Sequence, residues 1–413
     1  MIHVCFGLYD ATGLYSKFTG TTMFSLLENT KVPARTITVH ILHDDTLTPE
    51  NRAKFSEVAA RFRQIVKFYN VGELCADKLA EYVSLIPKVT TSSVSVGAFY
   101  RLLIPKILKP NIGKVIYLDS DLIINLDINE LWQIELGDKP VGAVPSYRQS
   151  PGHKGIYRVK ASQMCLAGLV KPEDYFGSGV LLMNLKVWRK EEKLLMEGIR
   201  FRGEHPEYRF FDQEILNYCF STNYLKLPVK FNRYVKFARS ENEPLSEGNI
   251  YHYAGRNAGL TLDLEDPFNR LWMDYFIKTP WFNVESIGRF YDSVKQLYID
   301  LKQAMANVTA NMSGKTRVFY VTKDNVEMIK QVFSVREDEE IIFASNSAPL
   351  KKLVNNIKAS DGSKIFIVIV PKFPFRFLTR RGFTPGKDFL DGVEFLSEAQ
   401  GVLPNFYELI MAM

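Results

Sequence analysis

Apolar runs and amphipathic stretches alternate along the first 230 residues of the chain. HVCFGLYD, RTITVHILHDD, QIVKFYNV and KVIYLD are rich in β-branched and aromatic residues, which predicts strands. Between them, FTGTTMFSLLENT, TPENRAKFSEVAARF and SVGAFYRLLIPKIL carry apolar residues at helical spacing. The second of these helices is expected to begin with Thr48 as its cap and Pro49 in its first turn. This alternation predicts an α/β domain with a mostly parallel central sheet.

The pattern continues less regularly towards residue 285. Residues 141–145 and 178–185 predict further strands, and residues 209–220 and 267–282 predict helices. The stretch from 230 to 260 is rich in turn-forming residues, and no regular element is predicted there.

A small polar segment, TANMSGKT, then separates this region from a second series of alternating elements. RVFYVT, EEIIFAS and KIFIVIV predict strands, with amphipathic stretches between them. We therefore expect one domain over residues 1–285, a helical extension and linker over 286–314, and a small α/β domain over 315–413.

Composition adds few constraints. The 413 residues are 46% hydrophobic and 24% charged, as in an ordinary globular protein, and the net charge is +6. That charge suits an anionic ligand or an anionic membrane surface and does not require nucleic acid. The start of the chain lacks a signal-peptide pattern, and the longest apolar run, IFIVIV, is too short to span a bilayer. We expect a cytoplasmic location and reduced thiols at Cys5, Cys75, Cys165 and Cys219.

Two aspartates, Asp119 and Asp121, follow directly after the apolar run of KVIYL. A carboxylate is costly to bury unless it is paired or bound to a metal. Side chains two apart on an extended segment face the same side, and ligands of open α/β sheets bind at the carboxyl ends of strands. Two carboxylates so placed can ligate a hard divalent cation and hold a diphosphate through it.

A third candidate ligand, His252, stands in YHYAGRNAG. The glycines that follow it would let the backbone approach a phosphate closely. An imidazole added to two carboxylates suits Mn²⁺ better than Ca²⁺. Arg256 would be a nearby partner for the phosphate.

The aspartate pair has two other interpretations. It is compatible with a strand that ends in two solvated aspartates. It is also compatible with phosphatases of the haloacid dehalogenase type, which place such a pair after a strand. Those enzymes usually continue with a Gly-Thr turn, whereas Leu122 and Ile123 follow here. Their later acidic motif would have to come from Asp388 to Asp391, beyond the expected linker.

Six segments follow one another in order up to about residue 285: FYRLLIPKIL, KVIYLDSDLIINLDINELW, YFGSGVLLMNLKVWR, FFDQEILN, HYAG and LWMDYFIKTPW. In their order and spacing they resemble glycosyltransferase family 8, the retaining sugar-nucleotide transferases with a GT-A fold. Among them the chain looks most similar to bacterial lipopolysaccharide and lipooligosaccharide glucosyl- and galactosyltransferases. The resemblance weakens after about residue 285.

The resemblance implies a role for each matched residue. Asp119, Asp121 and His252 would bind Mn²⁺ or Mg²⁺, which bridges the phosphates of a UDP-sugar. Asp212 would hydrogen-bond the sugar hydroxyls, and Gln213 would lie beside the anomeric carbon. The remaining donor-binding positions would be Asp10 and Tyr15 at the uracil and ribose, Arg101 near the diphosphate and sugar, Gly255 closing over the diphosphate, Arg256 as a phosphate partner, and Ser120.

The implied activity is metal-dependent transfer of glucose or galactose, with retention, from a UDP-sugar to a saccharide or glycolipid acceptor of the cell envelope. Because an amide is a poor nucleophile, we expect the acceptor hydroxyl to attack from the front face, with Gln213 as an electrostatic aid. Two positions depart from the family pattern: Ala258 replaces a lysine, and Gly177 replaces an asparagine. They motivate an alternative, a GT-A module that binds sugar nucleotide or glycan with weak or no transfer.

Residues 315–413 have three candidate roles: acceptor recognition, formation of a homo-oligomer, and membrane docking. The segment PKFPFRFLTRRGF mixes aromatic residues with four cations, a composition that suits peripheral contact with an anionic membrane surface. A basic loop around buried aromatic residues is the simpler interpretation. The four cations are Lys372, Arg376, Arg380 and Arg381.

Overall fold

In the computed structural model the chain separates into two compact units, Met1–Ser286 and Ile287–Ala412. Each unit is described by itself. The structure describes residues 1–86, 96–146, 163–208, 210–254 and 265–283, with shorter pieces between 285 and 391.

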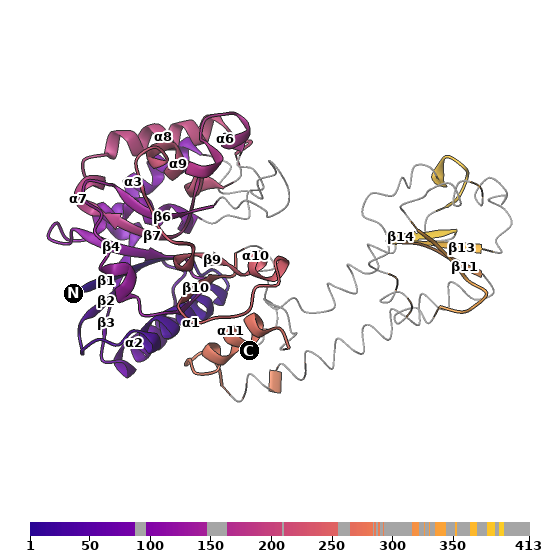
Figure 1. Ribbon diagram of the computed structural model, residues 1–413, viewed down its shortest axis with the longest axis horizontal. Coiled ribbons are helices and arrows are strands. Elements are labelled where there is room, and N and C mark those ends of the chain that lie inside the picture. Colours follow the sequence, from indigo (N-terminus) through magenta and orange to yellow (C-terminus); the bar gives the residue numbers. More distant parts are fainter. Residues whose placement is uncertain are drawn as a thin grey trace. The chain divides into compact units, whose positions relative to one another are not determined.

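A seven-stranded sheet forms the centre of the first unit (Figure 1). Its order is β3-β2-β1-β4-β7-β6-β8; the strands from β3 to β4 are parallel, and β7 runs antiparallel to both β4 and β6. The predicted α/β class with a mostly parallel central sheet is therefore confirmed. The strands are β1 (Ile2–Leu8), β2 (Ile37–His43), β3 (Ile65–Asn70), β4 (Lys114–Leu118), β6 (Val141–Pro145), β7 (Phe176–Asn184) and β8 (Leu225–Lys226).

Helices cover both faces of this sheet (Figure 1). One face carries α1 (Leu14–Asn29), α2 (Pro49–Arg61) and α11 (Pro267–Phe276). The opposite face carries a continuous apolar core under α3 (Val71–Leu85), η2 (Val96–Phe99), α4 (Tyr100–Ile107), α8 (Glu192–Glu204) and α9 (Phe211–Phe220). The shorter helices are α5 (Asn129–Trp132), α6 (Gln163–Leu166), η3 (Pro172–Asp174), α7 (Leu185–Trp188), η4 (Val229–Phe231) and α10 (Val235–Ser240).

A second sheet of the first unit has the order β5-β10-β9. It consists of β5 (Leu122–Asn125), β10 (Asn249–His252) and β9 (Arg233–Tyr234). β5 continues the chain from β4 after only three residues, so the polypeptide passes from one sheet to the other at Asp119–Asp121.

The outer edge of β5 is covered by hydroxyl groups of α1. The Thr22 hydroxyl accepts the Leu122 N–H at 3.2 Å and lies 2.6 Å from the Leu122 carbonyl oxygen, and the Ser25 hydroxyl accepts the Ile124 N–H at 3.0 Å. An uncovered strand edge would leave backbone groups without partners. Side chains of a helix thus do what a neighbouring strand usually does.

One predicted helix start is confirmed and other predicted elements need correction. Thr48 caps α2 as expected, since its hydroxyl accepts the Asn51 N–H at 3.2 Å. The helix over 71–85 was not predicted, because only Val71 and Tyr82 of its side chains are buried. Residues 230–260, expected to be turns, contain η4, β9, α10 and β10. Those elements have two to six residues each, too few for a periodic pattern.

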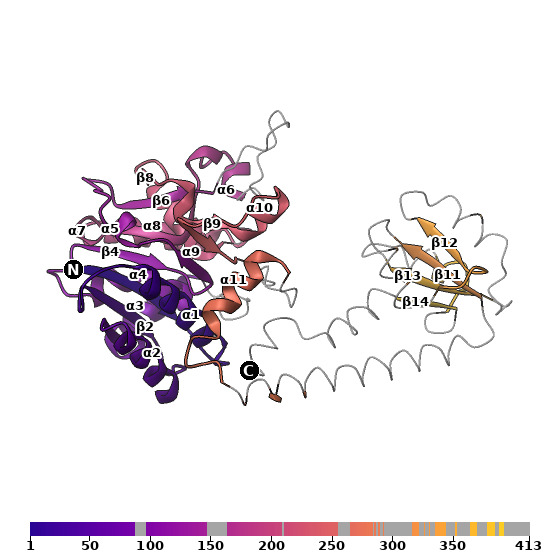
Figure 2. The same ribbon diagram turned by 60° about the horizontal axis from the view of Figure 1, so that its bottom comes forward.

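The second unit contains a four-stranded, fully parallel sheet of order β12-β11-β13-β14 (Figure 2). Its strands are β11 (Thr316–Val321), β12 (Glu340–Phe343), β13 (Lys364–Ile369) and β14 (Phe389–Asp391). The first three were predicted. A buried carboxylate, Glu339, pairs with Arg317 at the sheet and with Arg336 at 3.2 Å. The linker predicted over 286–314 and the helices expected between these strands lie largely outside the described residues.

Candidate functional site

The two predicted carboxylates lie where the chain changes sheets. The Asp119 N–H donates to the Gly179 carbonyl of β7 at 2.8 Å, while the Asp121 carbonyl accepts the Tyr253 N–H beside β10 at 2.9 Å. Residues 119–121 are therefore a bend and not the extended segment we assumed. The carboxylates nevertheless converge, because the turn brings both of them towards the end of β10.

His252, the last residue of β10, completes this cluster. Its Nε2 lies 3.3 Å from Asp121 Oδ1 and 4.0 Å from Asp119 Oδ2, and the three ligand atoms all lie within 4.8 Å of one another. Burial alone would lower the pKa of His252, but Asp121 and Asp119 outweigh it and raise that pKa. Burial would likewise raise the pKa of Asp121, yet His252 lowers it.

The donor set of this cluster fits a divalent cation. Two carboxylates and an imidazole nitrogen are ligands of borderline-hard metals such as Mn²⁺. The other ring nitrogen of His252, Nδ1, lies 2.8 Å from Asn232 Oδ1, so in the neutral ring the proton resides on Nδ1 and the Nε2 lone pair faces the carboxylates. The three side chains could therefore hold a metal ion.

Arg101, in the first turn of α4, connects this cluster to α9. Its guanidinium lies 2.8 Å from Asp119 Oδ1 and 2.9 Å from Asp212 Oδ2, and it donates to the Ser178 carbonyl at 2.9 Å. Burial disfavours the charge, but the two carboxylates outweigh it and raise the pKa of Arg101. At 6% exposure, this cation is a buried counter-charge between two acids.

Asp212 and Gln213 occupy the first turn of α9 and are anchored to β7. The Ser178 hydroxyl donates to Asp212 Oδ2 at 2.9 Å, and the Ser178 N–H donates to Gln213 Oε1 at 3.1 Å. Gln213 Nε2 donates in turn to the Tyr175 hydroxyl at 2.9 Å. Both ends of the Gln213 amide are thus held by the protein, and burial raises the pKa of Asp212.

The remaining predicted positions differ in how they face the cluster. Tyr15 is 48% exposed; partial burial of its hydroxyl, and then the charges of Asp121 and Asp119, raise its pKa. Asp10 is buried and accepts hydrogen bonds from the Ser16 N–H and hydroxyl at the start of α1.

Ser120 and the glycine-rich segment complete the set of predicted positions. The Ser120 hydroxyl accepts from the Thr19 hydroxyl of α1 at 2.8 Å, so it is held against the helix. Gly255, Arg256 and Ala258 lie outside the described residues.

Sequence reasoning missed several residues that shape the site. A Cβ at Gly179 would lie 2.4 Å from His252 Cε1 and 3.0 Å from Asp119 Oδ2, so only glycine lets β7 pass so close to the cluster. Ser178, which holds Asp212 and Gln213, lies between this glycine and Gly177. The Gly-Ser-Gly run at the start of the strand predicted over 178–185 was the signal that could have revealed them.

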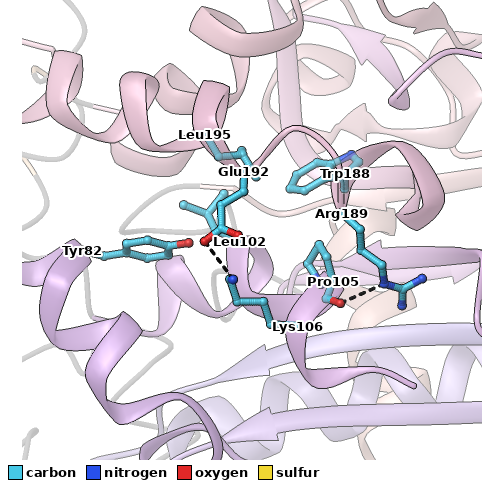
Figure 3. A pocket seen from close by; sticks show the side chains of 8 residues that line it. All are labelled: Tyr82, Leu102, Pro105, Lys106, Trp188, Arg189, Glu192 and Leu195. Atoms are coloured by element: carbon cyan, nitrogen blue, oxygen red, sulfur yellow. Dashed lines mark hydrogen bonds and ion pairs between the residues drawn. The ribbon is translucent and has the colours of Figure 1, made fainter. Parts of the chain in front are cut away.

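A small cavity of about 120 Å³ lies elsewhere in the unit, between α3, α4, α7 and α8 (Figure 3). Lys106 and Glu192 form an ion pair of 2.9 Å in its wall. Its lining residues include none of the predicted site residues: Tyr82, Leu102, Pro105, Lys106, Trp188, Arg189, Glu192 and Leu195. Among the described helices, none has the length and apolar character needed to cross a membrane.

The sheet order is that of the GT-A fold of glycosyltransferases, and an aspartate pair and a histidine meet at the carboxyl end of β4. The chain belongs to glycosyl transferase family 8, whose model matches residues 8–257. The predicted family, fold and enzyme class are therefore confirmed.

Individual relatives agree with this assignment. General stress protein A of Bacillus subtilis is 24% identical over 283 residues, which are 65% of this chain and 91% of that protein. Lipopolysaccharide 1,2-glucosyltransferase of Escherichia coli is 28% identical over 285 residues, 63% of this chain and 74% of that protein. The crystal structure of the galactosyltransferase LgtC with donor and acceptor sugar analogs has a TM-score of 0.50 at 20% identity and covers 70% of this chain and 99% of that chain. At this identity the likeness is one of fold.

Proposed function

We propose that the protein is a metal-dependent, retaining transferase that moves glucose or galactose from a UDP-sugar to a saccharide acceptor of the cell envelope. The observation that carries the proposal is the convergence of Asp119, Asp121 and His252 beside the Arg101–Asp212 pair. One relative supports the choice of a hexose donor and an envelope saccharide acceptor, since it is named a lipopolysaccharide 1,2-glucosyltransferase.

Asp119, Asp121 and His252 would hold Mn²⁺ or Mg²⁺. Such an ion, when bound, supplies positive charge that stabilises the departing diphosphate. The chain's own contribution is to keep the three ligands converged: Arg101 fixes Asp119, and Asn232 orients His252. Tyr15, Asp10, Ser120, Gly255 and Arg256 are proposed to complete the binding of the UDP moiety.

Asp212 and Gln213 are proposed to act at the sugar. Arg101 and Ser178 hold Asp212 Oδ2, which leaves its Oδ1 outside both contacts and suited to accept a sugar hydroxyl. The bond from the anomeric carbon to the β-phosphate oxygen breaks, and the acceptor oxygen bonds from the same face while its proton passes to that phosphate oxygen. The Gln213 carbonyl dipole stabilises the positive charge that develops on the sugar. A covalent glycosyl adduct trapped on Gln213 or Asp212 would contradict this front-face route.

The proposal is tested by the release of UDP from a panel of UDP-sugars with Mn²⁺, Mg²⁺ or EDTA. We expect one hexose donor to be hydrolysed slowly, and both EDTA and Asp121→Asn to abolish the reaction. Asp138→Asn, which changes an exposed aspartate in a turn, is the matched control and retains the rate. Metal-independent turnover, or turnover that survives Asp121→Asn, would contradict the metal site.

A second candidate function is a module that binds sugar nucleotide or glycan with weak or no transfer. It is motivated by Gly177, where the family pattern has an asparagine. A Cβ at this position would lie 2.7 Å from the Tyr234 hydroxyl and 3.1 Å from Ser146 Oγ, so a larger side chain has no room in this fold. UDP binding that depends on metal, without turnover of any donor, would favour this candidate.

The organisation of the chain is also proposed. Residues 1–285 carry the transferase, 286–314 form an extension and linker, and 315–413 form a separate domain that recognises acceptor, dimerises or docks to a membrane. We propose a cytoplasmic protein with peripheral contact at the inner face of the membrane. If vesicle binding is unchanged after the four cations of 371–383 are neutralised, the membrane contact is wrong.

A further inference from the structure

The imidazole of His252 is held by two side chains from about 20 residues earlier in the chain, Asn232 just before β9 and Tyr234 within it. Asn232 Oδ1 lies 2.8 Å from His252 Nδ1, and the ring of Tyr234 stacks on the His252 ring with centroids 4.8 Å apart and planes inclined by 21°. Asn232 is 1% exposed and His252 is 4% exposed, so these contacts are made in the interior.

The contact with Asn232 determines which nitrogen of His252 is available to a ligand. A carboxamide oxygen only accepts hydrogen bonds, so a neutral His252 must carry its proton on Nδ1. Its lone pair then lies on Nε2, the atom 3.3 Å from Asp121. Without the amide oxygen, the ring could place its proton on Nε2, and no lone pair would face the carboxylates.

The stack with Tyr234 determines the plane of the ring, and it requires space in β7. The Tyr234 hydroxyl would lie 2.7 Å from a Cβ at position 177, and His252 would lie 2.4 Å from a Cβ at position 179. Contacts this short between a side chain and a new carbon force one of them to move. Two glycines of β7 therefore stand opposite the two stacked rings, one for each ring.

We propose that Asn232 and Tyr234 are positioning residues for His252, and that Gly177 is the counterpart in β7 that makes room for Tyr234. The inference rests on the proposed function, because it takes His252 as a metal ligand. It also reinterprets a departure from the family pattern. The glycine at 177 is matched to Tyr234, and the pair holds the imidazole in place.

The first test measures the dissociation constant of Mn²⁺ by titration calorimetry, with bound Mn²⁺ counted by electron paramagnetic resonance. Asn232→Leu removes the acceptor, and Tyr234→Leu removes the stacked ring. Residues that orient a metal ligand typically change affinity by about 10- to 100-fold, and we expect losses in that range for both. Asn232→Asp keeps an acceptor for Nδ1–H and should bind Mn²⁺ as tightly as the wild type or more tightly.

The second test uses the contact between positions 177 and 234. Gly177→Ala should weaken Mn²⁺ binding, because the new Cβ would lie 2.7 Å from the Tyr234 hydroxyl and 3.2 Å from Asn232 Nδ2, with the closer contact at Tyr234. Tyr234→Phe keeps the ring but removes the hydroxyl, so the double variant Gly177→Ala/Tyr234→Phe should recover affinity lost by the single variant. A double variant that binds no better than Gly177→Ala would overturn the pairing of these residues.

The outcomes separate this inference from the function on which it rests. If the wild type binds no Mn²⁺, the proposed metal site fails. If the wild type binds Mn²⁺ and Asp121→Asn does not, while Asn232→Leu and Tyr234→Leu bind within about two-fold of the wild type, the site stands and the positioning role is wrong. Circular dichroism checks that each variant is folded. If Asn232→Leu is unfolded, the other variants decide. The proposal stands if Asn232→Asp binds Mn²⁺ at least as tightly as the wild type and the 177/234 double variant binds it better than Gly177→Ala. The opposite results overturn it.

Discussion

Arg101 and Asp119 form an ion pair of 2.8 Å in which the arginine side chain is 7% exposed and the aspartate 23% exposed. The same guanidinium pairs with Asp212 on the other side, so a single buried cation compensates two acids of the site. A buried charge whose partner is removed is strongly destabilising. The arrangement therefore links the stability of the unit to the geometry of its carboxylates.

Replacing Arg101 tests this link. We expect Arg101→Ala to lower the free energy of unfolding by about 3 kcal/mol and to abolish turnover, because Asp119 and Asp212 are left facing each other without a counter-ion. Urea unfolding and the UDP-release assay measure the two effects. Arg101→Lys keeps the positive charge, but an ammonium group lacks the planar guanidinium that contacts Asp119 and Asp212 together. It should therefore recover part of the stability and little of the activity. Full activity in Arg101→Ala would contradict the assigned role.

The hydroxyl groups of α1 along β5 provide a second prediction. Thr22→Val keeps the shape but removes the group that pairs with the backbone of Leu122. Leaving such buried groups without a partner should cost about 1–3 kcal/mol. Thr22→Ser retains the hydroxyl and should be close to the wild type.

Thr21→Val is the control for this substitution, since the Thr21 hydroxyl donates only within its helix, to the Lys17 carbonyl at 2.8 Å. Thermal unfolding of the three variants measures the difference. Equal losses for Thr21→Val and Thr22→Val would show that helix propensity, and not the edge of β5, is responsible.

Gly20 and Trp281 make a third case. A Cβ at position 20 would lie 2.2 Å from Trp281 Cζ3, in a contact that docks the segment after α11 onto α1. Gly20→Ala should therefore destabilise the protein by about 1–3 kcal/mol despite the higher helix propensity of alanine. Gly288→Ala, in the second unit, is the comparison: a Cβ there meets nothing within 4 Å, and the substitution should leave the unfolding of the first unit unchanged. A neutral or stabilising Gly20→Ala would contradict the close approach of Trp281.

His40 predicts a pH dependence of stability. Burial, and then the neighbouring His3 and Lys67, lower the pKa of His40 to about 3. Because an unfolded histidine titrates near its ordinary pKa, the unfolded state binds more protons between these two values, and stability falls as the pH falls from about 6.5. The contribution has a slope of at most about 1.4 kcal/mol per pH unit. Urea unfolding between pH 4 and 7 should show a shallower slope for His40→Gln.

His205→Gln is the comparison for this experiment, since the His205 side chain is exposed and pairs with Glu207 at the surface. It should leave the slope of the wild type unchanged. An unchanged slope in His40→Gln would mean that acid destabilisation arises elsewhere, in the carboxylates.

The sequence was informative where chemistry is encoded locally. The strand of KVIYL, the aspartates after it and the cap at Thr48 were predicted because each depends on residues a few positions apart. His252 was recognised by type, but its neighbours Asn232 and Tyr234 were not, because β9 has two residues and carries no periodic pattern. The contact of the α1 hydroxyls with β5 was not predicted for a related reason. Thr and Ser residues at helical spacing do not reveal which strand they cover until the fold is known.

The bend at Asp119–Asp121 places the proposed metal ligands on two different sheets. Asp119 is bonded to the large sheet through β7, whereas Asp121 and His252 belong to the small sheet through β5 and β10. A ligand that contacts all three side chains would therefore connect the two sheets. Binding of a ligand by all three side chains would also restrain the two sheets relative to each other.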